Sequence, residues 1–187
     1  GAVLATNSSA LSIDEIAAGT SRPADVVGTH FFSPANVMKL LEVVRGEQTA
    51  SDVIMTAMAL GRRIDKVPAV CGNCYGFLAN RSRAPFGIES ASLILEGASP
   101  SQVDEVMFGF GYPVGPFVVN DIAGIDVGYM VRQTKKAADP ENYQPNPVAD
   151  RLYEMGRLGM KTGAGFYRYA EGSRTPLVDP EVNRVID

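Results

Sequence analysis

The clearest pattern in the chain is the stretch Gly28-Thr-His-Phe-Phe-Ser-Pro-Ala-Asn-Val-Met-Lys-Leu-Leu-Glu-Val-Val44, which contains the only histidine. His30 ends an apolar run that begins at Val26, and Pro34 follows soon after it. Because proline has no backbone N–H to donate to a sheet, a central strand must end before Pro34. The apolar run over residues 40–44 predicts a second buried strand.

Glu42 places a carboxylate inside this second run, where a strand would bury it. A buried carboxylate needs a partner. If the two strands are neighbours, His30 can donate one ring N–H to Glu42, which fixes its tautomer and leaves the other nitrogen as a proton acceptor. That is the arrangement of an oriented general base. A single histidine near a strand end is more commonly structural, so the pattern alone leaves both interpretations open.

Composition bounds the class of protein. The chain has 187 residues, 45% of them hydrophobic and 20% charged, which is typical of a soluble globular protein with one ordinary domain or two small ones. A net charge of −4 without a Lys/Arg cluster argues against nucleic acid and anionic membranes as partners. No apolar run reaches the length of a membrane span, and the first residues lack a secretory signal pattern, so we expect no export.

Cys71 and Cys74 form a single Cys-x-x-Cys motif. With no second pair and no nearby histidine, the motif lacks the four ligands of a zinc site, and we expect no metal. The strand-like segment 67–71 before it makes a redox role conceivable, yet small buried thiols are the commoner case. We predict two reduced, structural cysteines.

Strands and helices alternate through residue 72. A short buried strand at residues 2–5 leads into the loop Asn7-Ser8-Ser9, where parallel α/β sheets place ligand-binding residues. Ser12 and Glu15 fit a capping box for a short helix that closes at Gly19.

Either Thr49 or Ser51 should cap a second helix, which stops at Gly61 and is followed by the strand 67–71. Its inward-facing residues are predicted to be Val53, Ile54, Ala57 and Leu60.

This α/β pattern contains too few units for a complete doubly wound sheet. A dinucleotide-binding fold holds the pyrophosphate at a Gly-x-Gly-x-x-Gly turn that opens a helix, and the sequence has no such turn. Gly163-Ala-Gly165 precedes aromatic, strand-like residues instead. We therefore expect the glycine-rich turn to lie upstream of residue 1 and the chain to be an internal fragment.

From residue 73 onward, helices punctuated by Gly and Pro replace this alternation, so we expect one domain over residues 1–72 and a second over 73–187. A long helix is predicted from Gly76 to Leu95, and Ser99-Pro-Ser-Gln102 predicts the start of the next helix. Its apolar positions at helical spacing are usually core, although they could form a partner surface. They are Val103, Val106, Met107 and Phe110.

Several stretches, in order, resemble the 3-hydroxyacyl-CoA dehydrogenase family, most closely the dehydrogenase part of multifunctional fatty-acid oxidation enzymes, where an enoyl-CoA hydratase domain comes first. The resemblance implies the C-terminal part of a Rossmann-type NAD-binding domain followed by a helical C-terminal domain, that is, α/β plus all-α. The matching stretches are Ala5-Thr-Asn-Ser-Ser-Ala-Leu-Ser12, His30-Phe-Phe-Ser-Pro34, Met38-Lys-Leu-Leu-Glu-Val-Val44, Asn73-Cys-Tyr-Gly-Phe-Leu-Ala-Asn-Arg81, Gly111-Tyr-Pro-Val-Gly-Pro-Phe117 and Lys161-Thr-Gly-Ala-Gly-Phe-Tyr167.

In that family a His–Glu pair, a Ser and an Asn line the site, and the matching positions are His30, Glu42, Ser9 and Asn80. The resemblance implies that His30 takes the proton of the substrate 3-hydroxyl while hydride passes to NAD, with Glu42 stabilising the imidazolium. Ser9 and Asn80 would hydrogen-bond the substrate oxygen. Without the family, Asn80 is equally a helix-surface or capping amide, and Ser9 a turn hydroxyl.

The resemblance also implies the partners. We expect NAD as cofactor, with Asn7 and Lys161 as contacts, and 3-hydroxyacyl-CoA or 3-ketoacyl-CoA as substrate. The helical domain is expected to self-associate, as a homodimer or in an equivalent packing. By resemblance the compartment is peroxisomal or bacterial cytoplasmic.

Two other functions stay open. The chain could be a non-catalytic helical packing module, or a different NAD-dependent 3-hydroxyacid dehydrogenase, although those enzymes usually use a lysine base. Because the glycine-rich turn is missing, the isolated chain is expected to be inactive.

Overall fold

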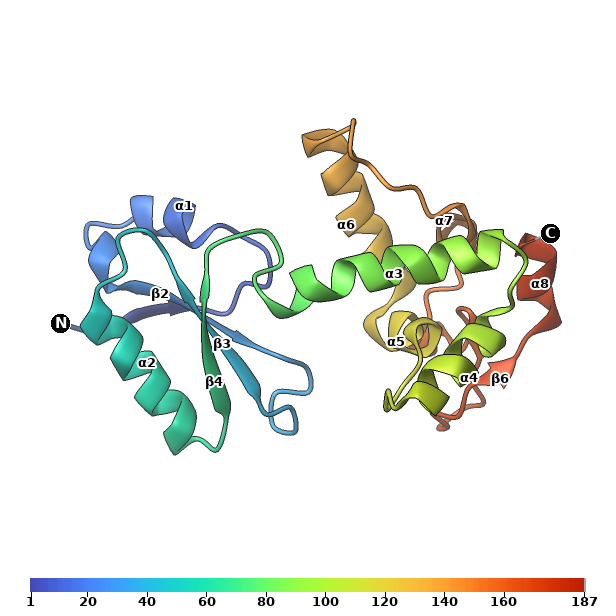
Figure 1. Ribbon diagram of the computed structural model, residues 1–187, viewed down its shortest axis with the longest axis horizontal. Coiled ribbons are helices and arrows are strands. Elements are labelled where there is room, and N and C mark those ends of the chain that lie inside the picture. Colours follow the sequence, from blue (N-terminus) through green and yellow to red (C-terminus); the bar gives the residue numbers. More distant parts are fainter. Residues whose placement is uncertain (187) are drawn as a thin grey trace. The chain divides into compact units, whose positions relative to one another are not determined.

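The computed structural model describes residues 1–186, the side chain of residue 138 excepted, and divides into two compact units. The first comprises residues 1–85 and the second begins at Phe86. The first is α/β and the second mainly helical, which confirms the predicted fold class (Figure 1). The division falls within the long helix α3 (Ala79–Leu95), so compactness does not fix a domain boundary, and the one expected between residues 72 and 73 stays a prediction.

The first unit contains a four-stranded sheet with the order β1-β2-β3-β4. β1 pairs parallel with β2, β2 antiparallel with β3, and β3 parallel with β4. The sheet is therefore mixed. As the proline predicts, β2 ends before Pro34. The strands are β1 (Leu4–Thr6), β2 (Val26–Phe31), β3 (Leu40–Arg45) and β4 (Val67–Gly72).

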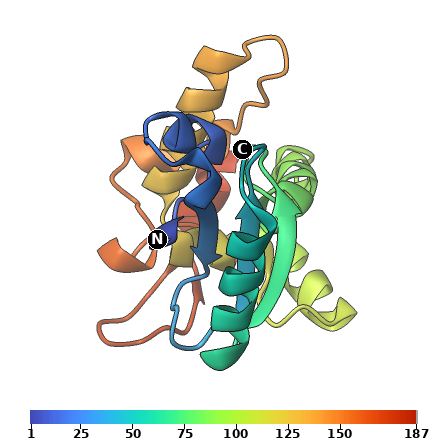
Figure 2. The same cartoon turned by 90° about the vertical axis from the view of Figure 1, so that its left-hand side faces the viewer.

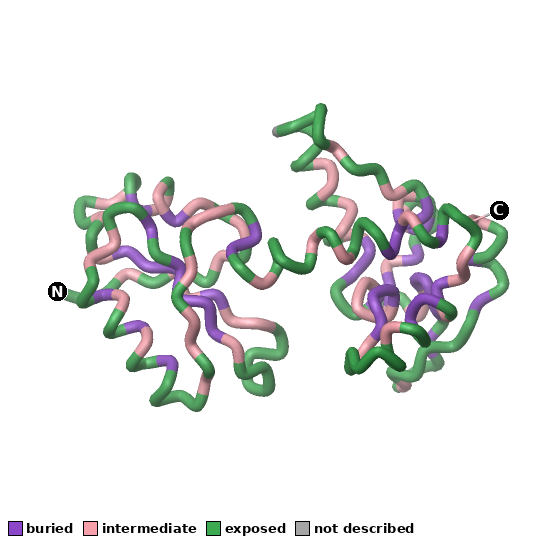
Figure 3. The backbone as a smooth tube through the Cα atoms, viewed as in Figure 1, coloured by how far each residue is buried: buried purple, intermediate pink, exposed green. Residues whose placement is uncertain are grey.

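Helices α1 (Ile13–Ala18) and α2 (Ser51–Arg63) cover opposite faces of this sheet (Figure 2). Successive strand residues point to opposite faces, so each buried strand feeds two cores. The α1 core contains Val26 and Val44, and the α2 core contains their sequence neighbours Val27 and Val43. Figure 3 shows how burial concentrates in β2 and β3. A short 3-10 helix, η1 (Pro23–Asp25), leads into β2.

The predicted ends of α2 are wrong. Ala50 is its N-cap and gives no side-chain hydrogen bond, and the helix runs past Gly61 to Arg63. Gly61 is buried, and a Cβ there would lie 2.9 Å from the Cβ of Pro68, so this glycine permits close packing on β4 rather than ending the helix. Leu60, predicted to face inward, is exposed.

Helix α3 begins later than predicted. The residues before Ala79 form a turn in which Gly76 and Phe77 both have positive φ, 74° and 49°. Left-handed backbone does not continue a right-handed helix, so the helix cannot begin at Gly76.

The second unit packs its helices around one core. The capping box of Ser99 and Gln102 at the start of α4 is confirmed, and Gly111 ends that helix in the left-handed conformation. The elements are α4 (Pro100–Phe110), α5 (Pro116–Ala123), α6 (Ile125–Ala138), α7 (Pro147–Glu154), the 3-10 helix η2 (Met160–Thr162), strands β5 (Tyr167–Arg168) and β6 (Leu177–Val178), and α8 (Pro180–Ile186).

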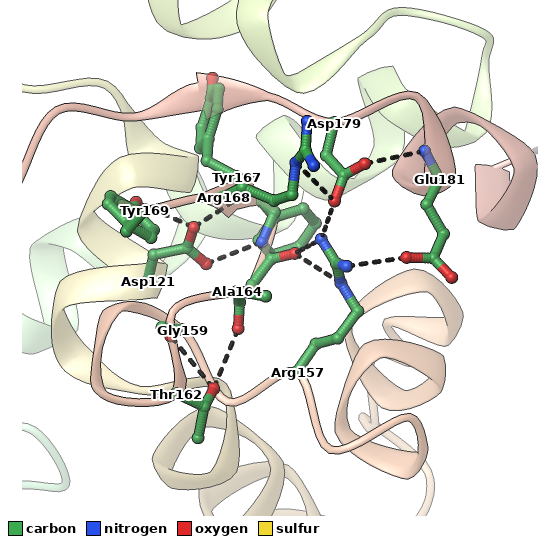
Figure 4. A network of polar contacts seen from close by, with 12 residues as sticks. Asp121, Arg157, Gly159, Thr162, Ala164, Tyr167, Arg168, Tyr169, Asp179 and Glu181 are labelled. Atoms are coloured by element: carbon green, nitrogen blue, oxygen red, sulfur yellow. Dashed lines mark hydrogen bonds and ion pairs between the residues drawn. The ribbon is translucent and has the colours of Figure 1, made fainter. Parts of the chain in front are cut away.

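A buried carboxylate ties α5 to β5. Asp121 is 1% exposed, and it accepts the backbone N–H groups of Phe166 and Tyr167, at 2.8 and 2.9 Å, and the hydroxyl of Tyr169, at 3.0 Å (Figure 4). Burial raises the pKa of Asp121, although these bonds oppose the rise. The glycine-rich segment at 163–165 thus leads into a strand anchored to a helix, and it opens no helix of its own.

The guanidinium of Arg157 joins α8 to the same region. It donates to the carbonyl of Gly165 at 2.9 Å, to Asp179 at 2.8 Å and to Glu181 at 3.0 Å (Figure 4). Burial works to raise the pKa of Asp179, but the bonds from Arg157 and from the N–H of Glu181 outweigh it and lower that pKa.

The apolar positions of α4 are only partly core. Val103 is buried, whereas Val106 and Phe110 are 70% and 80% exposed. Within residues 1–186, no helix has both the length and the apolar character needed to cross a membrane.

Candidate active site

His30 and Glu42 lie directly opposite each other on the antiparallel strands β2 and β3. The imidazole Nδ1 of His30 lies 2.6 Å from Oε2 of Glu42, and the two residues are only 6% and 0% exposed. An ionised carboxylate only accepts, so Nδ1 carries the proton, and in the neutral imidazole Nε2 then has the lone pair. The pairing expected from the two apolar runs is therefore present.

The second oxygen of Glu42 is also bound. Its Oε1 accepts the backbone N–H groups of Leu78 and Ala79, at 3.0 and 2.7 Å. Ala79 begins α3, so the carboxylate sits where unpaired amides and the helix dipole favour a negative charge. Glu42 is thus held at both oxygens and cannot turn away from His30 without breaking three contacts.

Two aromatic rings pack on the imidazole. The ring centroid of Phe32 lies 4.4 Å from that of His30, tilted by 49°. Phe77 lies 5.7 Å away, edge-on at 61°, and is only 1% exposed. The rings exclude water from the pair, which strengthens its electrostatic interaction.

Ser9 and Asn80, the other predicted site residues, are both exposed. Ser9 lies in the loop between β1 and α1, and Asn80 in the first turn of α3. No side-chain hydrogen bond of either is found among residues 1–186, so both are available to a ligand. Their roles stay predictions.

The predicted cofactor contacts are differently placed. The carboxamide Oδ1 of Asn7 accepts the N–H of Phe31 at 2.9 Å, which fixes the loop after β1 to the end of β2. Lys161 belongs to the second unit, where its ammonium forms an ion pair with Asp126 at 2.6 Å. That ammonium would have to leave Asp126 to bind a phosphate.

Asn73 was not predicted as a site residue, yet it bonds to residues that directly follow the loop of Ser9. Its Oδ1 accepts the N–H of Ile13 at 3.1 Å, and its Nδ2 donates to Ser12 at 3.1 Å and to Asp14 at 2.5 Å. The side chain therefore ties the end of β4 to the start of α1. Nothing in the local pattern around Asn73 predicts bonds to residues so distant in sequence.

The two cysteines are free thiols in this structure. Burial raises the pKa of Cys71 from 9.0 to about 11, and the negative charge of Glu42 is the second-largest cause of the rise. A thiol with this pKa is a poor nucleophile near neutral pH, which favours the structural interpretation over a redox one.

The turns after β1 and β3 lack the open glycines that a pyrophosphate site needs. Of the described residues, the loop 7–12 after β1 has no glycine, and the turn after β3 has only Gly46, where a Cβ would lie 2.6 Å from Oδ1 of Asp14. Glycines are needed where backbone amides approach a pyrophosphate closely. These two turns therefore do not offer the close backbone approach that a pyrophosphate needs.

Comparisons with known proteins agree with the motifs. Residues 1–74 match the family model described as 3-hydroxyacyl-CoA dehydrogenase, NAD binding domain, and residues 76–169 match 3-hydroxyacyl-CoA dehydrogenase, C-terminal domain. The peroxisomal bifunctional enzyme of Cavia porcellus is 44% identical over 179 residues, which cover 90% of this chain and 25% of that protein. The fatty acid oxidation complex subunit alpha of Acinetobacter baumannii is 37% identical over 189 residues, covering 98% of this chain and 26% of that protein.

A crystal structure of (S)-3-hydroxybutyryl-CoA dehydrogenase from Ralstonia eutropha has 37% identity and a TM-score of 0.82, covering 90% of this chain and 60% of that one. The dehydrogenase part of multifunctional enzyme 1 from C. elegans has 30% identity and a TM-score of 0.63, covering 98% and 42%. The chain thus spans about a quarter of the length of its curated relatives. Since the two family models together match nearly all of it, the chain belongs to the 3-hydroxyacyl-CoA dehydrogenase family.

Proposed function

We propose that the chain is part of an NAD-dependent (S)-3-hydroxyacyl-CoA dehydrogenase of fatty-acid oxidation, which converts 3-hydroxyacyl-CoA to 3-ketoacyl-CoA. The observation that supports this best is the buried pair of His30 and Glu42, with Nδ1 held by the carboxylate and Nε2 free. A base of this kind suits removal of a proton from an alcohol.

In the oxidative direction, Nε2 of His30 takes the proton from the substrate 3-hydroxyl. The imidazole then becomes a cation, and Glu42 stabilises it at 2.6 Å without taking the proton. When bound, NAD supplies the hydride acceptor. Ser9 and Asn80 are proposed to donate hydrogen bonds to the substrate oxygen, and Asn7 and Lys161 to contact the cofactor.

The test is NADH-dependent reduction of acetoacetyl-CoA. Because the glycine-rich turn is expected upstream of residue 1, we would join the chain to the preceding part of the NAD-binding domain from the Cavia porcellus relative and assay the fused enzyme. His30→Gln should lower kcat about 10²- to 10⁴-fold, the usual contribution of a general acid–base group. Glu42→Gln should lower kcat less, because the amide oxygen can still accept a hydrogen bond from Nδ1–H, although the imidazolium then lacks a counter-charge.

Binding of NADH, followed by its fluorescence, is the control. Both variants should bind NADH as the unchanged fused enzyme does, because neither residue would be a cofactor contact. A fused enzyme that binds NADH, keeps its fold and reduces no acetoacetyl-CoA would contradict the proposed function and favour a helical packing module.

We also propose that the second unit self-associates through an aromatic surface, defined as Phe86, Phe110 and Tyr112. The rings of Phe86 and Tyr112 stack at 5.4 Å, and those of Phe110 and Tyr112 at 6.4 Å. Phe110 is 80% exposed, and Val106, one turn before it on α4, is 70% exposed. Exposed apolar groups gathered in one place are typical of a protein interface, and the family resemblance favours a second copy of the helical domain.

Phe110→Glu should weaken this self-association at least tenfold, because a second copy would have to bury the carboxylate. Sedimentation velocity over a concentration series measures the dissociation constant. Met55→Glu, at a similarly exposed apolar position on α2, should leave that constant unchanged. A chain that stays monomeric at all concentrations would contradict this proposal while leaving the catalytic one standing.

A further inference from the structure

The turn before α3 touches both members of the buried pair. Phe77 packs its ring edge on His30, and the two residues that follow it donate their amides to Glu42. The turn is closed by the N–H of Phe77, which donates to the carbonyl of Cys74 at 3.0 Å. One short segment therefore faces the base and its carboxylate partner together.

The backbone of this turn is unusual at Phe77. Its φ of 49° lies in the left-handed region, which residues other than glycine seldom adopt because Cβ crowds the carbonyl oxygen. Gly76, with φ of 74°, accommodates the same region freely. Strained backbone of this kind persists where the surrounding structure enforces it, and it gathers at functional sites.

Burial of the ring explains how the strain is tolerated. Phe77 fills the core between α1 and the sheet, where it lies among Ile13, Ala17, Val26 and Val44. A glycine would suit the backbone better but would leave this space empty and remove the ring beside His30. The aromatic side chain therefore makes the contact with His30, and the left-handed backbone directs the following amides to Glu42.

We propose that Phe77 is a positioning residue for the pair of His30 and Glu42, and this inference rests on the proposed function. Its ring limits the rotation of the imidazole, and its backbone aims the amides of Leu78 and Ala79 at Glu42. Both effects favour the form in which Nδ1 carries the proton and Nε2 faces the substrate.

The test uses the chain as it is, because His30 is its only histidine and reports without assignment ambiguity. Nitrogen-15 NMR of the imidazole distinguishes the Nδ1–H from the Nε2–H tautomer, and amide hydrogen exchange reports on Leu78 and Ala79. The unchanged chain should show mainly the Nδ1–H tautomer and slow exchange at both amides.

Two variants test the ring contact with His30 and the amide contacts with Glu42 separately. Phe77→Leu keeps a large buried side chain and removes the ring, and it should lower the ratio of Nδ1–H to Nε2–H tautomer at least fivefold. Gly76→Ala adds a Cβ that would lie 3.3 Å from the N of Arg81, in a left-handed residue, and it should speed exchange at both amides at least tenfold. Val26→Ala, a control in the same core, should change neither quantity more than twofold.

In the fused enzyme, Phe77→Leu should lower kcat at least tenfold and leave KM within twofold, when kcat is calculated per folded molecule. Simple loss of stability would lower only the folded fraction, which circular dichroism measures, and would leave kcat per folded molecule unchanged. Folded variants that keep the tautomer ratio and amide protection of the unchanged chain would overturn the positioning role and leave the proposed function intact. An unchanged chain that shows mainly the Nε2–H tautomer would overturn both, because Glu42 would then not hold the base.

Discussion

At the scale of single residues, the environment of the buried carboxylate extends to Cys71. Burial and the charge of Glu42 raise the pKa of this thiol to about 11, so its thiolate forms only in alkaline solution. Iodoacetamide reacts with the thiolate, and the rate should therefore rise about tenfold per pH unit from pH 8 to 10 without levelling off. A Cys74→Ser variant restricts the reaction to Cys71, and mass spectrometry follows it.

The same variant unfolded in urea is the control, and its rate should level off near the ordinary thiol pKa. Adding Glu42→Gln should move the levelling in the folded chain to lower pH, because one cause of the raised pKa is removed. A folded chain whose rate levels off near pH 9 would show that Cys71 is not shielded as the structure implies.

The candidate site shows which residues a sequence can reveal. The contact of His30 with Glu42 was predictable, because polar residues inside apolar runs are conspicuous and two neighbouring strands would bring them together. The role of Phe77 was not predictable from local pattern, since a buried phenylalanine looks like ordinary core and its positive φ depends on tertiary packing. Family resemblance alone proposed Ser9 and Asn80, which are exposed and form no side-chain hydrogen bond among the described residues that would mark them.

At the scale of elements, Asn73 connects β4 to α1 by three side-chain hydrogen bonds. Asn73→Ala leaves the N–H of Ile13, at the start of α1, without this acceptor. The free energy of unfolding of the first unit should fall by about 1–3 kcal/mol, the cost of leaving a buried polar group unsatisfied. Urea unfolding measures this loss of free energy, and faster amide hydrogen exchange at Ile13 would show that the change occurs at the start of α1.

Gln48→Ala is the control, because Gln48 lies in the same unit, is exposed, and forms no side-chain hydrogen bond among residues 1–186. It should change stability by less than about 0.5 kcal/mol. Equal effects of the two substitutions would mean that Asn73 does not hold α1 in place.

Element ends illustrate a second limit of prediction. The start of α4 was predicted because Ser99 and Gln102 bond to each other's backbone within one turn, so the cause is local. The end of α2 was predicted wrongly because Gly61 packs closely against Pro68, a residue on another element. No local sequence rule distinguishes a glycine that permits such packing from one that ends a helix. Hydrogen bonds within one turn can be predicted from sequence, whereas close packing between distant elements cannot.

At the scale of the whole molecule, the first compact unit has two cores and the second has one, and each unit has its own spectroscopic reporter. His30 lies in the first unit, while of the seven tyrosines only Tyr75 belongs to that unit and the others belong to the second. The chain has no tryptophan, so tyrosine emission follows mainly the second unit. The two units can therefore be followed separately in one unfolding experiment.

Gly165→Ala should destabilise the second unit selectively. An added Cβ would lie 1.9 Å from Oδ1 of Asp121, so the carboxylate would have to abandon the amides it binds in the buried network. The expected loss is about 2–4 kcal/mol, as for a broken buried hydrogen-bond network. Gly109→Ala, in α4 with open space around its Cβ, should be neutral or slightly stabilising. If the two units unfold independently, Gly165→Ala should lower the urea midpoint measured by tyrosine emission and leave the midpoint measured by the His30 resonance unchanged. A common shift of both midpoints would mean that the chain unfolds as one cooperative unit.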